Sequence, residues 1–123
     1  MAKKVLIVED EPSLSKVLKK KIEQLGYAVT VAVDGNDALA KIKSGKPDLI
    51  ILDIVMPKKN GIEVLRELRV KLESKVPVII LSNLESPQDM EASKHYQVVD
   101  YIFKSDISLS DLTAKVAKIL GAV

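Results

Sequence analysis

Short apolar runs alternate along this chain with segments in which apolar residues recur at helical spacing, and this alternation limits the fold more than any other feature. The apolar runs lie at residues 5–8, 29–33, 49–52, 78–81 and 98–103. A run without polar residues, such as Leu49–Leu52, is typical of a strand covered on both faces. Val29, Val31 and Val33 instead alternate with small residues, which indicates a strand nearer the edge of the sheet.

The segments between the runs carry start and stop signals of helices. Asp34, Asn60, Ser86 and Ser108 stand where helices are expected to begin, and Glu63 follows Asn60 by three positions. Gly26 and Gly45 are placed to end the first two helices. The fourth helix is expected to run from Pro87 to about Tyr96. The residues expected on the apolar faces of the first, third and fifth helices are Leu14, Val17, Leu18, Ile22 and Leu25, then Leu65, Leu68 and Leu72, then Leu109, Leu112, Val116 and Ile119.

Five strands alternating with five helices predict an α/β fold, in which a doubly wound parallel sheet has helices on both sides in three layers. The length of 123 residues fits one domain, 1–123, with one core. Apolar residues make up 47% and charged residues 29% of the chain, so no disulfide or metal is needed for folding. The chain has no cysteine, which excludes thiol catalysis and cysteine-ligated zinc.

The charge balance and the short apolar runs exclude two classes of partner. The net charge is +2, from 19 basic and 17 acidic residues, which is too even to suggest nucleic-acid binding. Lys19, Lys20 and Lys21 spread around a helix and are read as a solvated face. The apolar runs are too short to span a bilayer, and we expect no signal peptide, because the first run is too short for one and acidic residues follow it at once. We therefore expect a cytoplasmic protein with no membrane contact.

Polar groups follow four of the five predicted strands. They are Glu9-Asp10-Glu11 after the first, Asp53 after the third, Ser82-Asn83 after the fourth and Lys104 after the fifth. In open parallel sheets, sites form beyond the carboxyl ends of the strands, where the strand order reverses. With the strand order 2-1-3-4-5, the first and third strands are neighbours. That order brings Glu9, Asp10 and Asp53 together.

Three carboxylates so close either take up a proton or bind a cation. At about 4 Å and an effective dielectric constant near 20, each pair costs on the order of 4 kcal/mol. Carboxylate oxygens beside open water suit Mg²⁺. Each residue also has a simpler interpretation: helix capping beside Pro12 for the acidic triplet, a turn for Asp53 or Ser82, and a solvated lysine for Lys104. The combination favours a site.

The chain resembles the receiver domain of two-component response regulators over essentially its whole length, which implies a flavodoxin-like fold. The matching stretches are Val5–Glu11, Asp53–Gly61, Leu81-Ser82 and Asp100–Lys104. The resemblance implies that Asp53 is a phosphoacceptor for a histidine kinase or a phosphotransfer protein.

The resemblance also assigns roles to the neighbouring residues. It implies Mg²⁺ as cofactor, bound by Asp10, Asp53 and the carbonyl of Val55, with Glu9 acting through water. Ser82 and Lys104 then bind the phosphoryl oxygens. Tyr101 is expected to turn inward on activation, which changes the face formed by the fourth helix, fifth strand and fifth helix. That face would bind a downstream protein target, and the protein is expected to be a monomer or a weak phosphorylation-dependent dimer.

The sequence departs from the family pattern near the site. Ser105 replaces the proline that usually follows the lysine, so we predict a trans Lys104–Ser105 peptide bond. Val55 and Leu84 are apolar where many relatives carry polar groups that could orient water, which predicts slow self-dephosphorylation. His95 could suggest a phosphodonor, but a surface histidine at a helix end is the simpler interpretation.

Two other functions compete with that of a phosphorylatable receiver. One is a degenerate receiver that acts as a phosphorylation-independent interaction module. The other is a hydrolase with an aspartyl-phosphate intermediate, although Val55 stands where such enzymes commonly carry a second Asp. The receiver interpretation makes the protein a phosphoacceptor rather than an enzyme. The chain ends after the fifth helix, as expected of a stand-alone receiver or of one domain of a longer protein.

Overall fold

Strands and helices alternate along the chain in the predicted order. The computed structural model describes residues 2–54, 60–82, 87–106 and 108–121. The elements are β1 (Lys4–Val8), α1 (Pro12–Glu23), β2 (Ala28–Ala32), α2 (Gly35–Gly45), β3 (Leu49–Leu52), α3 (Gly61–Arg66), the π-helical turn η1 (Glu67–Lys71), β4 (Val78–Ser82), α4 (Pro87–His95), β5 (Asp100–Phe103), the 3₁₀ turn η2 (Lys104–Asp106) and α5 (Leu109–Leu120). No helix in the described part of the chain is long and apolar enough to cross a membrane.

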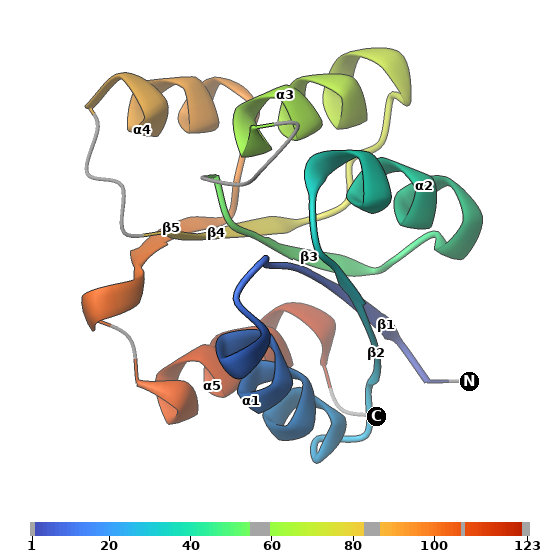
Figure 1. Cartoon of the computed structure of the whole chain (residues 1–123), viewed down its shortest axis with the longest axis vertical. Coiled ribbons are helices and arrows are strands. Elements are labelled where there is room, and N and C mark those ends of the chain that lie inside the picture. Colours follow the sequence, from blue (N-terminus) through green and yellow to red (C-terminus); the bar gives the residue numbers. More distant parts are fainter. Residues whose placement is uncertain (1, 55–59, 83–86, 107, 122–123) are drawn as a thin grey trace.

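The sheet is parallel and has the order β2-β1-β3-β4-β5, which confirms the predicted doubly wound, flavodoxin-like topology. Helices α1 and α5 cover one face of the sheet, and α2, α3 and α4 cover the other (Figure 1). Because all strands run in the same direction, their carboxyl ends meet at one edge of the sheet. The residues that follow β1 and β3 therefore lie side by side.

The strands separate two apolar clusters, one on each face of the sheet. Leu6 and Ile50 belong to the cluster beneath α2 and α3, whereas Val5, Ile7 and Ile51 belong to the cluster beneath α1 and α5. Successive strand residues point to opposite faces, so a sheet covered on both sides requires an uninterrupted apolar run. Burial of each such side chain contributes about 1.5–3 kcal/mol to the free energy of folding. This packing holds the strand ends in place relative to one another.

Several helix starts have the predicted capping contacts. The side chain of Asp34 accepts a hydrogen bond from the backbone N–H of Asp37 at 2.8 Å, and Ser108 accepts one from Asp111 at 3.1 Å. Asn60 accepts one from the N–H of Ile62 at 2.6 Å, which starts α3. These contacts satisfy N–H groups that have no partner within the helix. The predicted cap Ser86 lies outside the described residues.

Four apolar residues predicted to belong to strands or to a buried helix face lie instead at the surface. Val33 is 54% exposed because β2 ends one residue earlier, and Val99 is 53% exposed because β5 begins only at Asp100. Val17 and Leu25 are 42% and 39% exposed. The buried face of α1 is narrower than the apolar pattern suggested, and Leu25 lies beyond the end of the helix. Apolar periodicity predicts that a helix exists better than it predicts the limits of its buried face.

The third helix also differs from its prediction, because it continues past Arg66 as a wider π-helical turn. The N–H of Leu72 donates to the carbonyl of Glu67, five residues earlier, at 2.9 Å. Leu65 and Leu68 are buried as predicted, but Leu72 is only half-buried. The inserted residue rotates the last turn relative to the core, an effect that simple helical spacing cannot anticipate.

Arg69 lies in this widened turn and joins three segments of the chain. Its Nε donates to the carbonyl of Tyr96 at the end of α4 at 2.8 Å. Its Nη1 donates to the carbonyls of Ser74 at 3.0 Å and Val76 at 2.7 Å, in the loop before β4. The guanidinium group thus connects the end of α3 to the end of α4 through backbone acceptors.

Candidate functional site

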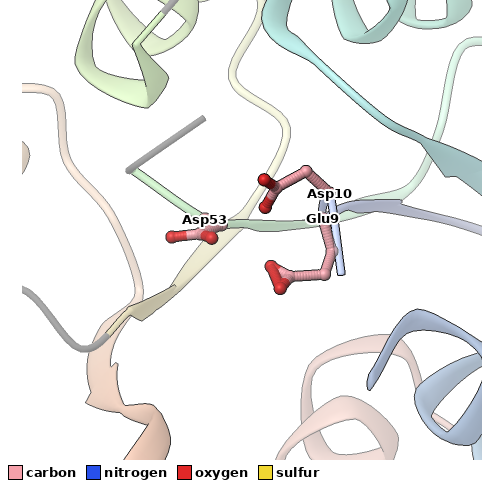
Figure 2. A group of neighbouring side chains, drawn as sticks. All are labelled: Glu9, Asp10 and Asp53. Carbon is pink, nitrogen blue, oxygen red and sulfur yellow. The ribbon is translucent and has the colours of Figure 1, made fainter. Parts of the chain in front are cut away.

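Glu9, Asp10 and Asp53 come together where β1 and β3 end. The backbone N–H of Asp53 donates to the carbonyl of Val8 at 3.0 Å, which extends the pairing of the two strands by one residue. One carboxylate oxygen from each of the three residues lies within 4.8 Å of the others. Figure 2 shows the two side chains from the end of β1 beside the one from the end of β3. The structure therefore brings together the carboxylates that the sequence predicted to meet.

The ammonium group of Lys104 lies between two of these carboxylates. Its Nζ is 2.7 Å and 3.0 Å from the two carboxylate oxygens of Glu9, and 3.0 Å from Oδ2 of Asp53. It is also 3.5 Å from Oε1 of the largely exposed Glu11. Because the side chains of Glu9 and Asp53 are only 3% and 5% exposed, the contacts of Lys104 to them form a buried ion-pair group.

Burial disfavours the charged forms of these side chains, and the attraction between their opposite charges partly offsets that cost. Burial raises the pKa of Glu9 to about 7; Lys104 opposes this effect and Asp53 reinforces it. Burial alone would lower the pKa of Lys104, but the hydrogen bonds and charges of Glu9 and Asp53 outweigh it and raise the pKa. Lys104 therefore stays protonated, and Glu9 gains a proton as the pH falls through about 7.

The carboxylate group can hold a divalent cation. Mg²⁺ binds oxygen at about 2.0–2.1 Å in an octahedron, so its ligand oxygens are about 3–4 Å apart. The oxygens of Glu9, Asp10 and Asp53 already lie within 4.8 Å of one another, so small side-chain rotations suffice. Asp10 is exposed, which leaves one side of the group open to water. The donor set thus fits Mg²⁺, which prefers a few carboxylates together with water molecules.

Of the other predicted site residues, Ser82 lies at the same edge of the sheet, whereas Tyr101 lies within β5, paired with Ile80. Ser82 is the last residue of β4 and is 1% exposed. Tyr101 in β5 is half-buried and packs against the cluster beneath α2 and α3, with its ring 5.6 Å from that of Phe103. Val55, whose carbonyl was predicted to bind the metal, and Leu84 lie outside the described residues.

The segment after Lys104 confirms one prediction. No peptide bond among the described residues is cis, so the Lys104–Ser105 bond is trans. The chain turns there through η2 before α5 begins. Lys104 reaches the carboxylates from this turn without the proline that usually follows the family's lysine.

Direct pairing of Glu9 with Lys104 was missed by sequence reasoning, which expected Glu9 to act through water on a metal. Both residues follow apolar strands, but they are 95 positions apart in the chain. Their contact depends on how far the Lys104 side chain extends across β3 and β4, the two strands that separate β1 from β5. No local signal in the sequence could have identified it.

Known proteins similar to this chain agree with the fold. The family model for the response regulator receiver domain matches residues 5–117. A CheY-like receiver domain protein from Methanospirillum hungatei is 28% identical, with a TM-score of 0.90, and the match covers 96% of this chain and 93% of that one. The receiver domain of Francisella response regulator 1452 is 36% identical, with a TM-score of 0.85 and 95% of each chain covered. The Vibrio cholerae chemotaxis protein CheY4 is 28% identical over 98% of this chain and 100% of that one, with a TM-score of 0.86.

Proposed function

The chain belongs to the response regulator receiver domain family of two-component signalling, and from that premise we propose that it is a phosphoryl switch with Asp53 as the acceptor. The donor is the phosphohistidine of a histidine kinase or of a phosphotransfer protein. The observation that supports this most strongly is the 3.0 Å contact between Lys104 Nζ and Asp53 Oδ2. It lies beside two further carboxylates able to hold a cation.

Asp53 is the nucleophile in this proposal. One of its carboxylate oxygens forms a bond to phosphorus while the bond from phosphorus to the donor imidazole nitrogen breaks, and the electron pair of that bond stays on the nitrogen. The transferred group carries its charge on three equatorial oxygens, so catalysis depends on positioning and on nearby positive charge. Its position at the end of a buried strand holds Asp53 rigidly for this attack.

The residues around Asp53 supply that charge and hold the new group. Asp10, Asp53 and the carbonyl of Val55 would bind Mg²⁺, with Glu9 reaching it through water. When bound, Mg²⁺ neutralises negative charge on the phosphoryl oxygens. Lys104 already contacts Asp53 and would pair with a phosphoryl oxygen, and the hydroxyl of Ser82 would donate a hydrogen bond to another.

The output of the switch is a shift between two packings of the face formed by α4, β5 and α5. Ser82 ends β4, which pairs with β5, so a change at Ser82 reaches Tyr101 through neighbouring strands. Helix α4 has few apolar residues: apart from Pro87, these are Met90 and Ala92. A helix with so little apolar surface is a suitable element to move at small cost. A downstream protein would recognise this face, which changes with phosphorylation.

Incubation with acetyl phosphate and Mg²⁺, followed by intact-mass spectrometry, tests the acceptor. We expect one phosphoryl group on the wild type, none on Asp53→Asn, and wild-type modification of Asp48→Asn, a control carboxylate at the opposite edge of the sheet. Modification of Asp53→Asn to the wild-type level would show that the acceptor is another residue. An unmodified wild type would favour the alternative of a phosphorylation-independent interaction module.

A further inference from the structure

Gly61, the first residue of α3, packs directly against the backbone of Asp53 and Ile54, the two residues that follow β3. We propose that Gly61 is a positioning residue for Asp53, because the lack of a side chain lets α3 lie against the peptide group between Asp53 and Ile54. The inference rests on the proposed function of Asp53 and adds to it a residue that determines where the carboxylate lies.

The space available at Gly61 is too small for any side chain. A Cβ atom built on Gly61 would lie 2.6 Å from the carbonyl oxygen of Asp53, 2.7 Å from Cα of Ile54 and 3.2 Å from the carbonyl carbon of Asp53. All three are backbone atoms, so no side-chain rotation can relieve the contact. The φ angle of Gly61 is not in the left-handed region, unlike those of Gly26 and Gly121. Space, rather than conformational freedom, is therefore what requires glycine at this position.

The peptide group that faces Gly61 is held on both sides. The N–H of Asp53 donates to the carbonyl of Val8 at 3.0 Å, and the N–H of Gly61 donates to the carbonyl of Ile54 at 2.8 Å. The side chain of Ile54 is fully buried in the cluster beneath α2 and α3. Moving the Asp53 carbonyl from 2.6 Å to an ordinary contact distance requires a displacement of roughly 0.8 Å.

A displacement of that size alters the site directly, because the carboxylate of Asp53 lies on the same residue. The 3.0 Å contact to Lys104 and the approach to Asp10 both depend on where its Cα lies. Misplacing a reacting group by about 1 Å can reduce a rate by about 10²-fold. If α3 moved away instead, a side chain at residue 61 would cost stability and leave the site unchanged.

A set of four variants, three single and one double, separates positioning from stability. Gly61→Ala introduces the contact, whereas Gly45→Ala is a matched change at a helical glycine with no heavy atom within 4 Å of the added Cβ. Ile62→Ala removes apolar packing of the same helix against the core without approaching the Asp53 peptide group. Gly61→Ala is also made together with Gly45→Ala, a helix-favouring change that offsets part of any loss of folding.

Two measurements are made on each variant, with rates normalised to the folded fraction. In the metal-free protein, the ¹⁵N–¹H resonances of the Asp53 amide and of the Lys104 ammonium report the geometry of the pair. With Mg²⁺, phosphorylation is followed against acetyl phosphate concentration. For Gly61→Ala we expect shifted resonances and a maximum rate reduced roughly 10- to 100-fold, with a smaller change in KM. We expect Gly45→Ala and Ile62→Ala to keep rates within about twofold of the wild type.

The outcomes distinguish this inference from the proposed function. A wild type that acetyl phosphate does not modify would refute the proposed function itself. If the wild type is modified and Gly61→Ala has the rate and resonances of Gly45→Ala, the positioning role is wrong. It is also wrong if Ile62→Ala loses as much activity as Gly61→Ala at the same folded fraction.

Discussion

Replacing Asp10 with asparagine removes one carboxylate from a group in which negative charge exceeds positive charge. Asp10 lies within 4.8 Å of carboxylate oxygens of Glu9 and Asp53, while Lys104 supplies one ammonium group to the same site. Asp10 is repelled by both Glu9 and Asp53, and the single positive charge of Lys104 compensates only one of these two repulsions. Because asparagine has nearly the same shape as aspartate, the substitution changes charge with little change in packing.

The expected gain follows from that single repulsion. At the 4.8 Å limit, two unit charges repel by about 0.9 kcal/mol in water and by about 3.5 kcal/mol at an effective dielectric constant of 20. Asp10 is exposed, so the value near water applies. We expect Asp10→Asn to stabilise the metal-free protein by about 1 kcal/mol, which raises Tm by about 3–5 °C for a chain of this size.

Thermal unfolding followed by circular dichroism, with a chelator present, measures this gain. Glu91→Gln, which neutralises an exposed carboxylate in α4, is the matched control and should leave Tm almost unchanged. The gain should shrink in high salt, because exposed charges are screened. Added Mg²⁺ should stabilise the wild type and not Asp10→Asn, since only the wild type keeps all three carboxylates. Equal or lower metal-free stability of Asp10→Asn at low salt would refute the picture of clustered carboxylates.

Three further predictions concern other residues. The pKa of Glu9 is about 7 in the folded protein, against an ordinary value of 4.5. Between these values the folded protein binds a proton that the unfolded chain does not. The resulting contribution to stability is complete below pH 4.5 and is lost as the pH rises through 7. Glu9→Gln should remove this pH dependence of the metal-free unfolding free energy, which amounts to up to about 1.4 kcal/mol per pH unit. Urea titrations across this pH range in which both proteins show the same pH dependence would contradict the prediction. Arg69→Met should lower the unfolding free energy in urea by about 2–4 kcal/mol because four backbone carbonyls lose a charged donor. A loss equally large in Arg69→Lys would show that the forked geometry of the guanidinium group matters more than its charge. Substituting Asn or Glu for Val55 and Leu84 should shorten the lifetime of phosphorylated Asp53, because these polar side chains can orient an attacking water molecule. Lifetimes measured by mass spectrometry that equal the wild-type value would refute this prediction.

The arrangement of the sheet could be predicted because its physical cause is visible in the linear chain. A parallel sheet covered on both faces requires uninterrupted apolar runs, and Leu49–Leu52 occurs as a strand with the predicted bounds. The caps Asp34 and Ser108 were predictable for a similar reason, since capping involves residues only three positions apart. The exposure of Val33 and Val99 could not be predicted, because the first and last residues of a strand depend on where pairing with its neighbour begins and stops.

The same distinction holds for the site. The sequence alone determined that Glu9, Asp10 and Asp53 meet, because parallel strands end at one edge and the order of the strands was predictable. Only the tertiary structure decided that Lys104 pairs with Glu9 as well as Asp53, and that α3 leaves no room for a side chain at Gly61. These contacts depend on differences of a few tenths of an ångström in the distances between segments that are far apart in the chain. Local pattern carries no such information, whereas the packing of strands and helices fixes it.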